Sequence, residues 1–196
     1  MSEPRNLERI AELVPTGSHV LDLGCGDGLL LSHLQSRRGC TGYGVELDDA
    51  KVLACVQRGV NVIQRNLEED LSIFEDGSFD VVLQLDTLQN LRNTEAMLRE
   101  TVRVGRIGIV AFPNFAHWPN RIRVASGRMP VTRVLPYQWY DTPNIRVGTY
   151  ADFEVLARKN GLSVIESFGI QHGKPVRTLP NLMASVAVFK FERLAG

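Results

Sequence analysis

The sequence predicts one α/β domain built on a mostly parallel β-sheet with helices on both faces. Three observations carry this prediction. Short apolar segments alternate with helical ones, a glycine-rich turn follows the first apolar segment, and the last two apolar segments lack a helix between them. The chain has 196 residues, of which 44% are hydrophobic and 22% charged. This length fits a single domain with one core, covering residues 1–196.

Seven segments have the short apolar pattern of strands. Residues 79–85 are almost continuously apolar, as expected for a strand covered on both faces. Because helical segments separate the first five strands, these strands should run parallel. The last two strands should form an antiparallel pair, which gives a seven-stranded sheet with an antiparallel last strand. The predicted strands are residues 18–23, 42–47, 60–64, 79–85, 106–112, 162–170 and 184–191.

Five segments have the apolar spacing of amphipathic helices. Glycines directly after three of them, Gly59, Gly105 and Gly161, are typical of helix ends. Thr94 is a suitable N-cap for the helix that it opens. The predicted helices are residues 7–14, 28–36, 49–58, 94–104 and 149–160.

Composition excludes several classes of partner. The 22 lysines and arginines balance 22 aspartates and glutamates, whereas nucleic-acid binding usually needs a basic domain. Cys25, Cys40 and Cys55 lack Cys-x-x-Cys spacing, which predicts reduced thiols and no metal site. The first fifteen residues do not resemble a signal peptide, and no stretch reaches the ~18 apolar residues of a membrane span. We expect a cytoplasmic protein that binds no nucleic acid and no membrane.

The strongest motif is the segment VLDLGCGDG, residues 20–28, between the first predicted strand and the next helix. Its glycines let the backbone turn sharply and let a ligand lie against the main chain. The following helix N-terminus favours an anionic group. Glu46 ends the second predicted strand, where a carboxylate can accept both hydroxyls of a ribose. The motif therefore predicts a site for a nucleoside-containing ligand.

Two ligands and a purely structural turn are the alternatives for this motif. A dinucleotide site uses Gly-x-Gly-x-x-Gly, whereas this chain has Gly-x-Gly-x-Gly with Asp22 before the first glycine. A carboxylate there repels a pyrophosphate but attracts the ammonium group of an amino-acid ligand. A structural turn with three glycines would cost chain entropy without adding core. The motif resembles the first motif of class I S-adenosylmethionine (SAM) methyltransferases, so SAM or S-adenosylhomocysteine is the favoured ligand.

Positions after the later strands complete the predicted cofactor site. Asn66 follows the third strand, where many SAM-binding proteins carry an aspartate that meets the adenine amino group. Its amide oxygen can still accept that hydrogen bond, and the alternative is that Asn66 is a simple loop residue. Leu85 ends the fourth strand, which lies beside the cofactor in such proteins. Cys25 is expected to be a small apolar filler. The predicted cofactor-binding residues are Asp22, Gly24, Cys25, Gly26, Asp27, Gly28, Glu46, Leu47, Asn66, Leu67 and Leu85.

No catalytic residue is predicted. The loop after the fourth strand reads Asp-Thr-Leu-Gln and lacks the Asp/Asn-Pro-Pro-Tyr/Phe motif of enzymes that methylate nucleic-acid amino groups. No cysteine follows a proline, as the cytosine-carbon methyltransferases require. Asp86 is either a base or an exposed loop carboxylate, and we favour the exposed carboxylate.

Residues 113–149 form an insert rich in proline, aromatic residues and arginine, for which we expect an irregular ordered segment or lid. Between His117 and Arg146 there are five arginines and one acid, a local charge of +4 on a neutral chain. The aromatic residues either cover the sheet edge or contact a ligand or partner. His117 can serve as a base, but we favour a hydrogen-bonded structural histidine beside Trp118.

The chain resembles a known family, the methionine-biosynthesis protein MetW. The matching stretches include LDLGCGDGLLL, SFDVVLQLDTLQNLRN, VAFPNFAHWPNRIRV and GRMPVTRVLPYQWYDTPNI, and together they run from about Val20 to Leu162. PYQWYDTPNI is the specific stretch, since generic SAM methyltransferases lack it. Asn66 departs from the family, which usually has aspartate there.

The resemblance implies a Rossmann-like class I methyltransferase fold. It also implies a role in methionine synthesis as accessory or regulatory partner of homoserine O-acyltransferase. The alternative is a SAM-dependent methyltransferase acting on a small substrate such as an anion, because the fold does not settle the chemistry.

Overall fold

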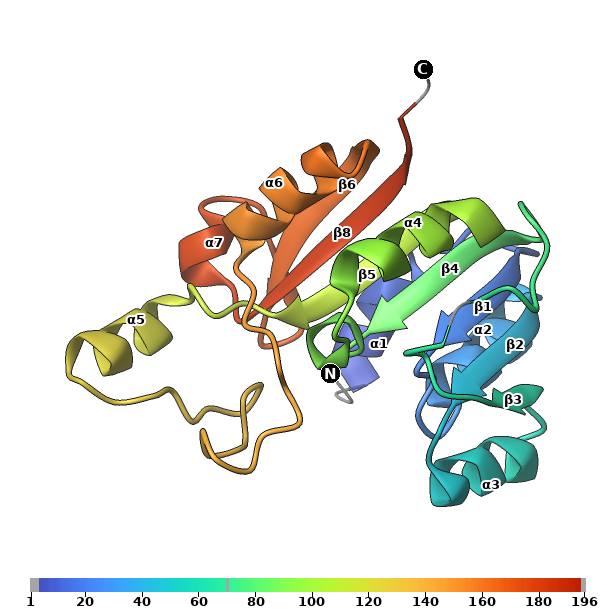
Figure 1. Cartoon of the computed structure of the whole chain (residues 1–196), viewed down its shortest axis with the longest axis horizontal. Coiled ribbons are helices and arrows are strands. Elements are labelled where there is room, and N and C mark those ends of the chain that lie inside the picture. Colours follow the sequence, from blue (N-terminus) through green and yellow to red (C-terminus); the bar gives the residue numbers. More distant parts are fainter. Residues whose placement is uncertain (1–3, 70, 195–196) are drawn as a thin grey trace.

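Eight strands in the described part of the chain form one mixed sheet, in the order β3-β2-β1-β4-β5-β8-β6-β7. The computed structural model describes residues 4–69 and 71–194, and Figure 1 shows the sheet with its helices. The strands are β1 (His19–Leu23), β2 (Thr41–Glu46), β3 (Val62–Gln64), β4 (Phe79–Leu85), β5 (Gly105–Pro113), β6 (Leu162–Gln171), β7 (Lys174–Val176) and β8 (Val186–Arg193).

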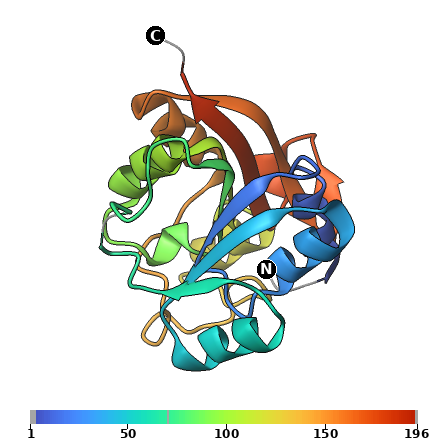
Figure 2. The ribbon, with the colours of Figure 1, turned by 90° about the vertical axis from the view of Figure 1, so that its right-hand side faces the viewer.

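Helices cover both faces of this sheet. In Figure 2, α2 lies on one side of the twisted sheet and α4 on the other. The α-helices are α1 (Pro4–Ala11), α2 (Leu29–Arg38), α3 (Asp49–Gln57), α4 (Thr94–Val104), α5 (Trp118–Ala125), α6 (Tyr150–Lys159) and α7 (Pro180–Met183), and a 3-10 helix, η1, spans Leu88–Asn90.

The first five strands are parallel, as the sequence predicts. β1 pairs with β2 on one side and with β4 on the other, so Val20 lies opposite both Gly42 and Val81. The strand order therefore reverses at β1. Open α/β sheets bind ligands at such a reversal, in the crevice outside the carboxyl ends of the strands. The glycine-rich turn follows β1 directly and lies at that edge.

The antiparallel part of the sheet confirms the predicted pairing but adds one strand. β8 runs antiparallel between β5 and β6. The predicted count of seven strands is wrong, because the connection after β6 contains the edge strand β7, paired antiparallel with β6. His172 and Gly173 join β6 to β7 with φ angles of 51° and 72°. A two-residue turn with both φ angles positive matches strand twist, which is why such a short hairpin can form here.

Two helix predictions also need correction. The N-cap of α4 is Asn93 and not Thr94, because the Asn93 side chain accepts a hydrogen bond from the amide of Ala96. The insert is not wholly irregular, because residues 118–125 form α5. Pro119 lies in the first turn of α5, where its missing N–H has no helical partner to lose.

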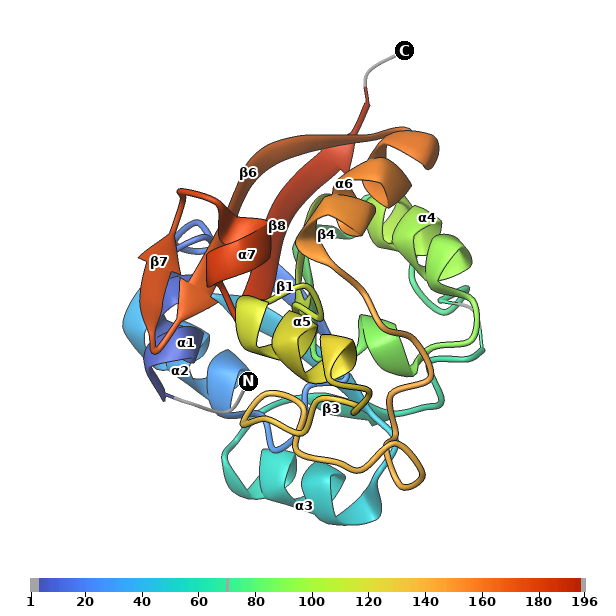
Figure 3. The same cartoon turned by 90° about the vertical axis from the view of Figure 1, so that its left-hand side faces the viewer.

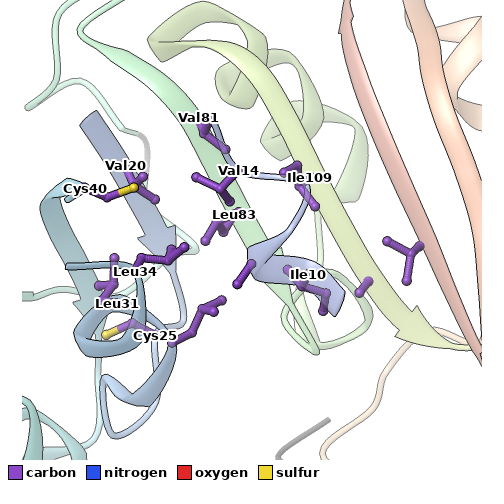
Figure 4. Packing of buried hydrophobic residues seen from close by; sticks show 14 of the residues in the cluster. Ile10, Val14, Val20, Cys25, Leu31, Leu34, Cys40, Val81, Leu83 and Ile109 are labelled. Carbon is purple, nitrogen blue, oxygen red and sulfur yellow. The ribbon is translucent and has the colours of Figure 1, made fainter. Parts of the chain in front are cut away.

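The apolar core occupies both faces of the sheet. Figure 4 shows Ile10 from α1, and Leu31 and Leu34 from α2, packed against Val81 and Leu83 of β4. On the opposite face, the aromatic rings of α6 pack against those of β8, with ring centroids of Phe153 and Phe189 4.5 Å apart. Burial on both faces holds the carboxyl edge of the strands rigid, where the glycine turn lies.

Candidate functional site

The glycine-rich turn adopts a conformation that requires glycine. Gly24, Gly26 and Gly28 have φ angles of 78°, 60° and 74°, a region that other residues occupy at a cost of about 1–2 kcal/mol each. A Cβ on Gly24 would lie 2.5 Å from the Thr87 hydroxyl, and one on Gly28 would lie 2.9 Å from the Cys55 sulfur. A Cβ on Gly26 would meet no atom within 4 Å. Gly26 therefore faces open space that a ligand can occupy.

Glu46 connects the glycine turn to the end of β2. Its Oε2 accepts a hydrogen bond of 2.9 Å from the Gly26 amide, and its Oε1 accepts bonds from the amides of Leu47 (2.9 Å) and Asp48 (3.1 Å). The turn is also held by the Gly24 amide, which donates to the Val45 carbonyl at 2.8 Å. The hydrogen bonds from backbone amides thus fix the orientation of the Glu46 side chain before any ligand binds.

Asp22 is a buried carboxylate beneath the turn. It is 2% exposed, and its Oδ1 has no hydrogen-bond partner. Burial raises its pKa to about 7, and the negative charge of Glu46 adds to the effect. A cation or an N–H donor from a ligand would both supply the missing hydrogen bond and compensate the charge.

Two cysteines fill the space under the turn. The sulfur atoms of Cys25 and Cys55 lie 3.8 Å apart, and that of Cys55 is 3.2 Å from the Gly26 carbonyl oxygen, to which the thiol donates. Both thiols are free, and burial raises the pKa of each. These cysteines are neutral packing groups, and the prediction that Cys25 is a small apolar filler agrees with its burial.

The remaining predicted cofactor residues take different positions around this edge. Asp27 is exposed and forms a 3.0 Å ion pair with Arg58 after α3. Leu47 and Asn66 are exposed, and the Asn66 Oδ1 accepts a bond of 3.0 Å from the Glu68 amide. Leu67 and Leu85 are half-buried, and each packs against an apolar core cluster.

Sequence reasoning missed Thr87, which connects the glycine turn to η1. Its hydroxyl donates a 2.8 Å hydrogen bond to the Leu23 carbonyl, immediately before Gly24. Two residues further on, the carbonyl of Gln89 accepts the amides of Ile145 and Arg146 at 3.0 Å each. One short segment therefore contacts both the predicted cofactor turn and the end of the insert. Spacing along the chain carries no indication of these contacts.

Asp86 and His117 differ from their predicted environments. Asp86 is half-buried, not exposed, with a φ of 56°, and burial raises its pKa. His117 is buried beside Trp118, edge to face at 6.3 Å, as predicted. Its Nε2 has no hydrogen-bond partner, so the expected hydrogen bond at this atom is absent. Burial, and secondarily the charge of His172, lower the pKa of His117.

Both ends of the insert are fixed to the sheet, while its middle is exposed. The Phe115 amide donates to the Gly148 carbonyl at 2.9 Å, which closes the insert at its base. Figure 3 shows α5 and the segment that returns to α6 on the same side of the molecule. Trp139 and Tyr140 are 72% and 71% exposed. These two aromatic side chains of the insert therefore do not cover the sheet.

Within residues 4–69 and 71–194, no three histidine, cysteine or acidic side chains lie together as a metal site would require. None of the helices in that part of the chain has the length and hydrophobicity needed to cross a lipid bilayer.

The chain is similar to several known proteins. A family model described as "Methionine biosynthesis protein MetW" matches residues 5–191. A bifunctional methionine biosynthesis protein MetXA/MetW of Rhodopirellula baltica is 37% identical over 95% of this chain, which spans 32% of that protein. A ubiquinone biosynthesis O-methyltransferase of Hahella chejuensis is 33% identical over 49% of this chain, covering 42% of the enzyme.

Among solved structures, a TehB-like SAM-dependent methyltransferase from Corynebacterium glutamicum has a TM-score of 0.64 to this chain. The match covers 96% of this chain and 87% of the other at 18% sequence identity. At this identity the similarity establishes the Rossmann-like methyltransferase fold and not the chemistry.

Proposed function

Because the chain belongs to the MetW family of methionine biosynthesis proteins, we propose that it is a SAM-binding accessory partner of homoserine O-acyltransferase. The observation that carries the proposed SAM binding is the glycine turn, which leaves space at Gly26 beside two buried carboxylates. The R. baltica relative, whose name joins MetXA to MetW, supports the proposed partnership with the acyltransferase. The free cysteines support a cytoplasmic location.

The residues around the turn fit the parts of SAM, which would supply a sulfonium-bound methyl group and an amino-acid ammonium. Asp22 would attract the ammonium group, because its buried Oδ1 lacks a hydrogen-bond partner. Glu46 would accept the ribose hydroxyls, in a position fixed by backbone amides. Gly26 would lie against the ligand, because it carries no Cβ. Leu47 and Leu85 would line the adenine side, and Asn66 would accept a hydrogen bond from the adenine amino group.

Calorimetry with SAM and S-adenosylhomocysteine tests the binding proposal. Wild type is expected to bind at least one of them, and Gly26→Val is expected to lose most of this affinity, since its side chain would fill the ligand space. Gly77→Val is the matched control, because Gly77 also has a positive φ, 64°, with no atom within 4 Å of an added Cβ. It lies in the loop before β4, away from the turn.

Equal losses in the two variants would mean that backbone strain, and not the ligand space, explains the result. Failure of wild type to bind either compound would refute the cofactor proposal altogether. Thermal unfolding of both variants shows whether each has folded.

The alternative is a SAM-dependent methyltransferase that acts on a small anionic substrate. The excess of arginine in the insert favours it, since methyl transfer needs mainly alignment and exclusion of water. Incubation with methyl-labelled SAM and a cell extract tests it. A labelled product would support methyl transfer, whereas bound SAM with no labelled product would leave the accessory role.

A further inference from the structure

We propose that a cavity between α4 and α6 binds a small carboxylic acid with an apolar body and a hydroxyl or amino group. The cavity has a volume of about 520 Å³ and is lined by η1, the start of α4, the end of the insert and α6. Volumes of ~300–1,000 Å³ are typical of small-molecule sites. Binding in this cavity would require neither bound SAM nor a partner protein.

One wall of the cavity is apolar. Leu88 of η1, Phe112 of β5, and Phe153 and Leu156 of α6 line it, together with Val147 at the end of the insert. These side chains come from four separate segments that converge at this place. An aliphatic chain would remove apolar surface from water on both the ligand and this wall.

Three arginines give the rest of the lining its positive charge. Arg146 donates a 2.8 Å hydrogen bond to the Arg92 carbonyl, and Arg99 donates one of 3.0 Å to the Asn160 side chain. The guanidinium of Arg92 has no hydrogen bond or ion pair within the described part of the chain. Arg92 is therefore the cation available to a carboxylate.

Two acids also line the cavity, but both have partners. Glu95 forms a 2.9 Å ion pair with Lys159 and lies 3.8 Å from Arg99. Asp152 accepts the Thr149 hydroxyl at 2.7 Å. Lys159 and Arg99 compensate the charge of Glu95, whereas the hydroxyl of Thr149 leaves Asp152 charged. With three arginines and two acids, the lining keeps one net positive charge.

The first turn of α4 faces the same space. Asn93 caps this eleven-residue helix through the Ala96 amide, which leaves the amides of Thr94 and Glu95 without a helical partner. Asn93, Thr94 and Glu95 line the cavity, whereas Ala96 does not. The positive end of the helix dipole thus adds to Arg92 in favouring an anion.

Gln89 supplies a second, independent indication of a ligand. It lines the cavity, is only 8% exposed, and its Oε1 has no hydrogen-bond partner. Its main-chain carbonyl, and not its side chain, accepts the amides of Ile145 and Arg146. An acceptor buried without a partner costs free energy, which a ligand hydroxyl or amino group would recover. Gln89 is therefore the expected specificity determinant.

Calorimetric titration of the full chain with three probes tests the proposal. 2-Hydroxyhexanoate carries all the proposed features, hexanoate lacks the hydroxyl, and hexylamine replaces the carboxylate with a cation. We expect the hydroxy acid to bind about fivefold more tightly than hexanoate, which is the effect of one modest hydrogen bond. Hexylamine should not bind.

Variants assign the binding to this cavity. Arg92→Gln should weaken both acids about tenfold, whereas Arg37→Gln, at an exposed position on α2, should leave both unchanged. Gln89→Leu should remove the preference for the hydroxy acid and leave hexanoate affinity unaltered, a selectivity change that misfolding cannot produce. Gly26→Val should bind both acids as wild type does, which separates this site from the proposed SAM site.

Four outcomes would overturn the proposal. The first is that neither acid binds at about 10 mM, and the second is that hexylamine binds as tightly as the acids. The third is that the Arg37 and Arg92 substitutions weaken binding equally. The fourth is that Gln89→Leu still prefers the hydroxy acid.

Discussion

At the scale of single residues, Asp22 couples the proposed site to stability. Its pKa is about 7 in the folded chain, because burial and the nearby Glu46 charge disfavour the carboxylate, against about 3.9 for an unfolded aspartate. Between pH ~4 and ~7 the folded state therefore holds a proton that the unfolded state has released. The free energy of unfolding should fall through this window as pH rises, by up to about 4 kcal/mol from this group.

The substitution Asp22→Asn tests that linkage, because asparagine stays neutral at every pH. Urea unfolding of wild type and variant at pH 4.5, 6 and 7.5 should show wild type losing stability relative to the variant as pH rises. Parallel pH profiles for the two proteins would show that Asp22 does not retain a proton in the folded state. Bound SAM should reduce the loss of wild-type stability at higher pH, since an ammonium group stabilises the charged Asp22 carboxylate.

At the scale of elements, Asn114 connects the end of β5 with α6, α7 and the start of the insert. It is fully buried, and its Nδ2 donates to the carbonyls of Asn181 (3.0 Å) and Ala184 (2.8 Å). Its Oδ1 accepts the amides of Ala116 and Tyr150, both at 3.2 Å. A single amide thereby satisfies backbone groups from three segments that are distant in sequence.

Asn114→Ala should lower the free energy of unfolding by about 3 kcal/mol, because it leaves several buried backbone groups unpaired. It should also speed tryptic cleavage after the insert arginines, since the base of the insert is loosened. Asn61→Ala is the control, because Asn61 is exposed and its one side-chain bond, to Gly42, is 3.5 Å long. Equal stability and cleavage in the two variants would contradict this role for Asn114.

At the scale of the whole molecule, the insert is the surface that we expect the acyltransferase to contact. The insert carries a local charge of +4, and Trp139 and Tyr140 are more than two-thirds exposed. Aromatic residues and arginines are enriched at protein interfaces, where burial of an aromatic ring contributes strongly. The chain as a whole is neutral, but this one segment is basic and rich in aromatic residues.

The double substitution Trp139→Ala/Tyr140→Ala should reduce co-purification with homoserine O-acyltransferase at least tenfold. Its thermal stability should match wild type, since both side chains are exposed. Leu53→Ala/Val155→Ala, at exposed positions on α3 and α6, should leave co-purification unchanged. Wild type that neither binds the acyltransferase nor alters its rate would refute the accessory role.

The sequence by itself determined the α/β class, the parallel order of β1 to β5 and the glycine turn after β1. These features depend on local information: apolar periodicity, and glycines at 24, 26 and 28 that all have positive φ. It also predicted the antiparallel late strands. It missed β7, because a two-residue hairpin at His172 and Gly173 produces no change in hydrophobic pattern.

Only the tertiary structure decided which groups meet across the molecule. The contact of Thr87 with Leu23, the four long-range hydrogen bonds of the Asn114 side chain, and the cavity beside Gln89 join residues far apart in the chain. Such contacts follow from how helices and loops pack on the sheet, and no short-range spacing encodes them. Burial likewise decided the protonation of Asp22, because the pKa of a carboxyl group depends on the water and charges around it and not on its neighbours in sequence.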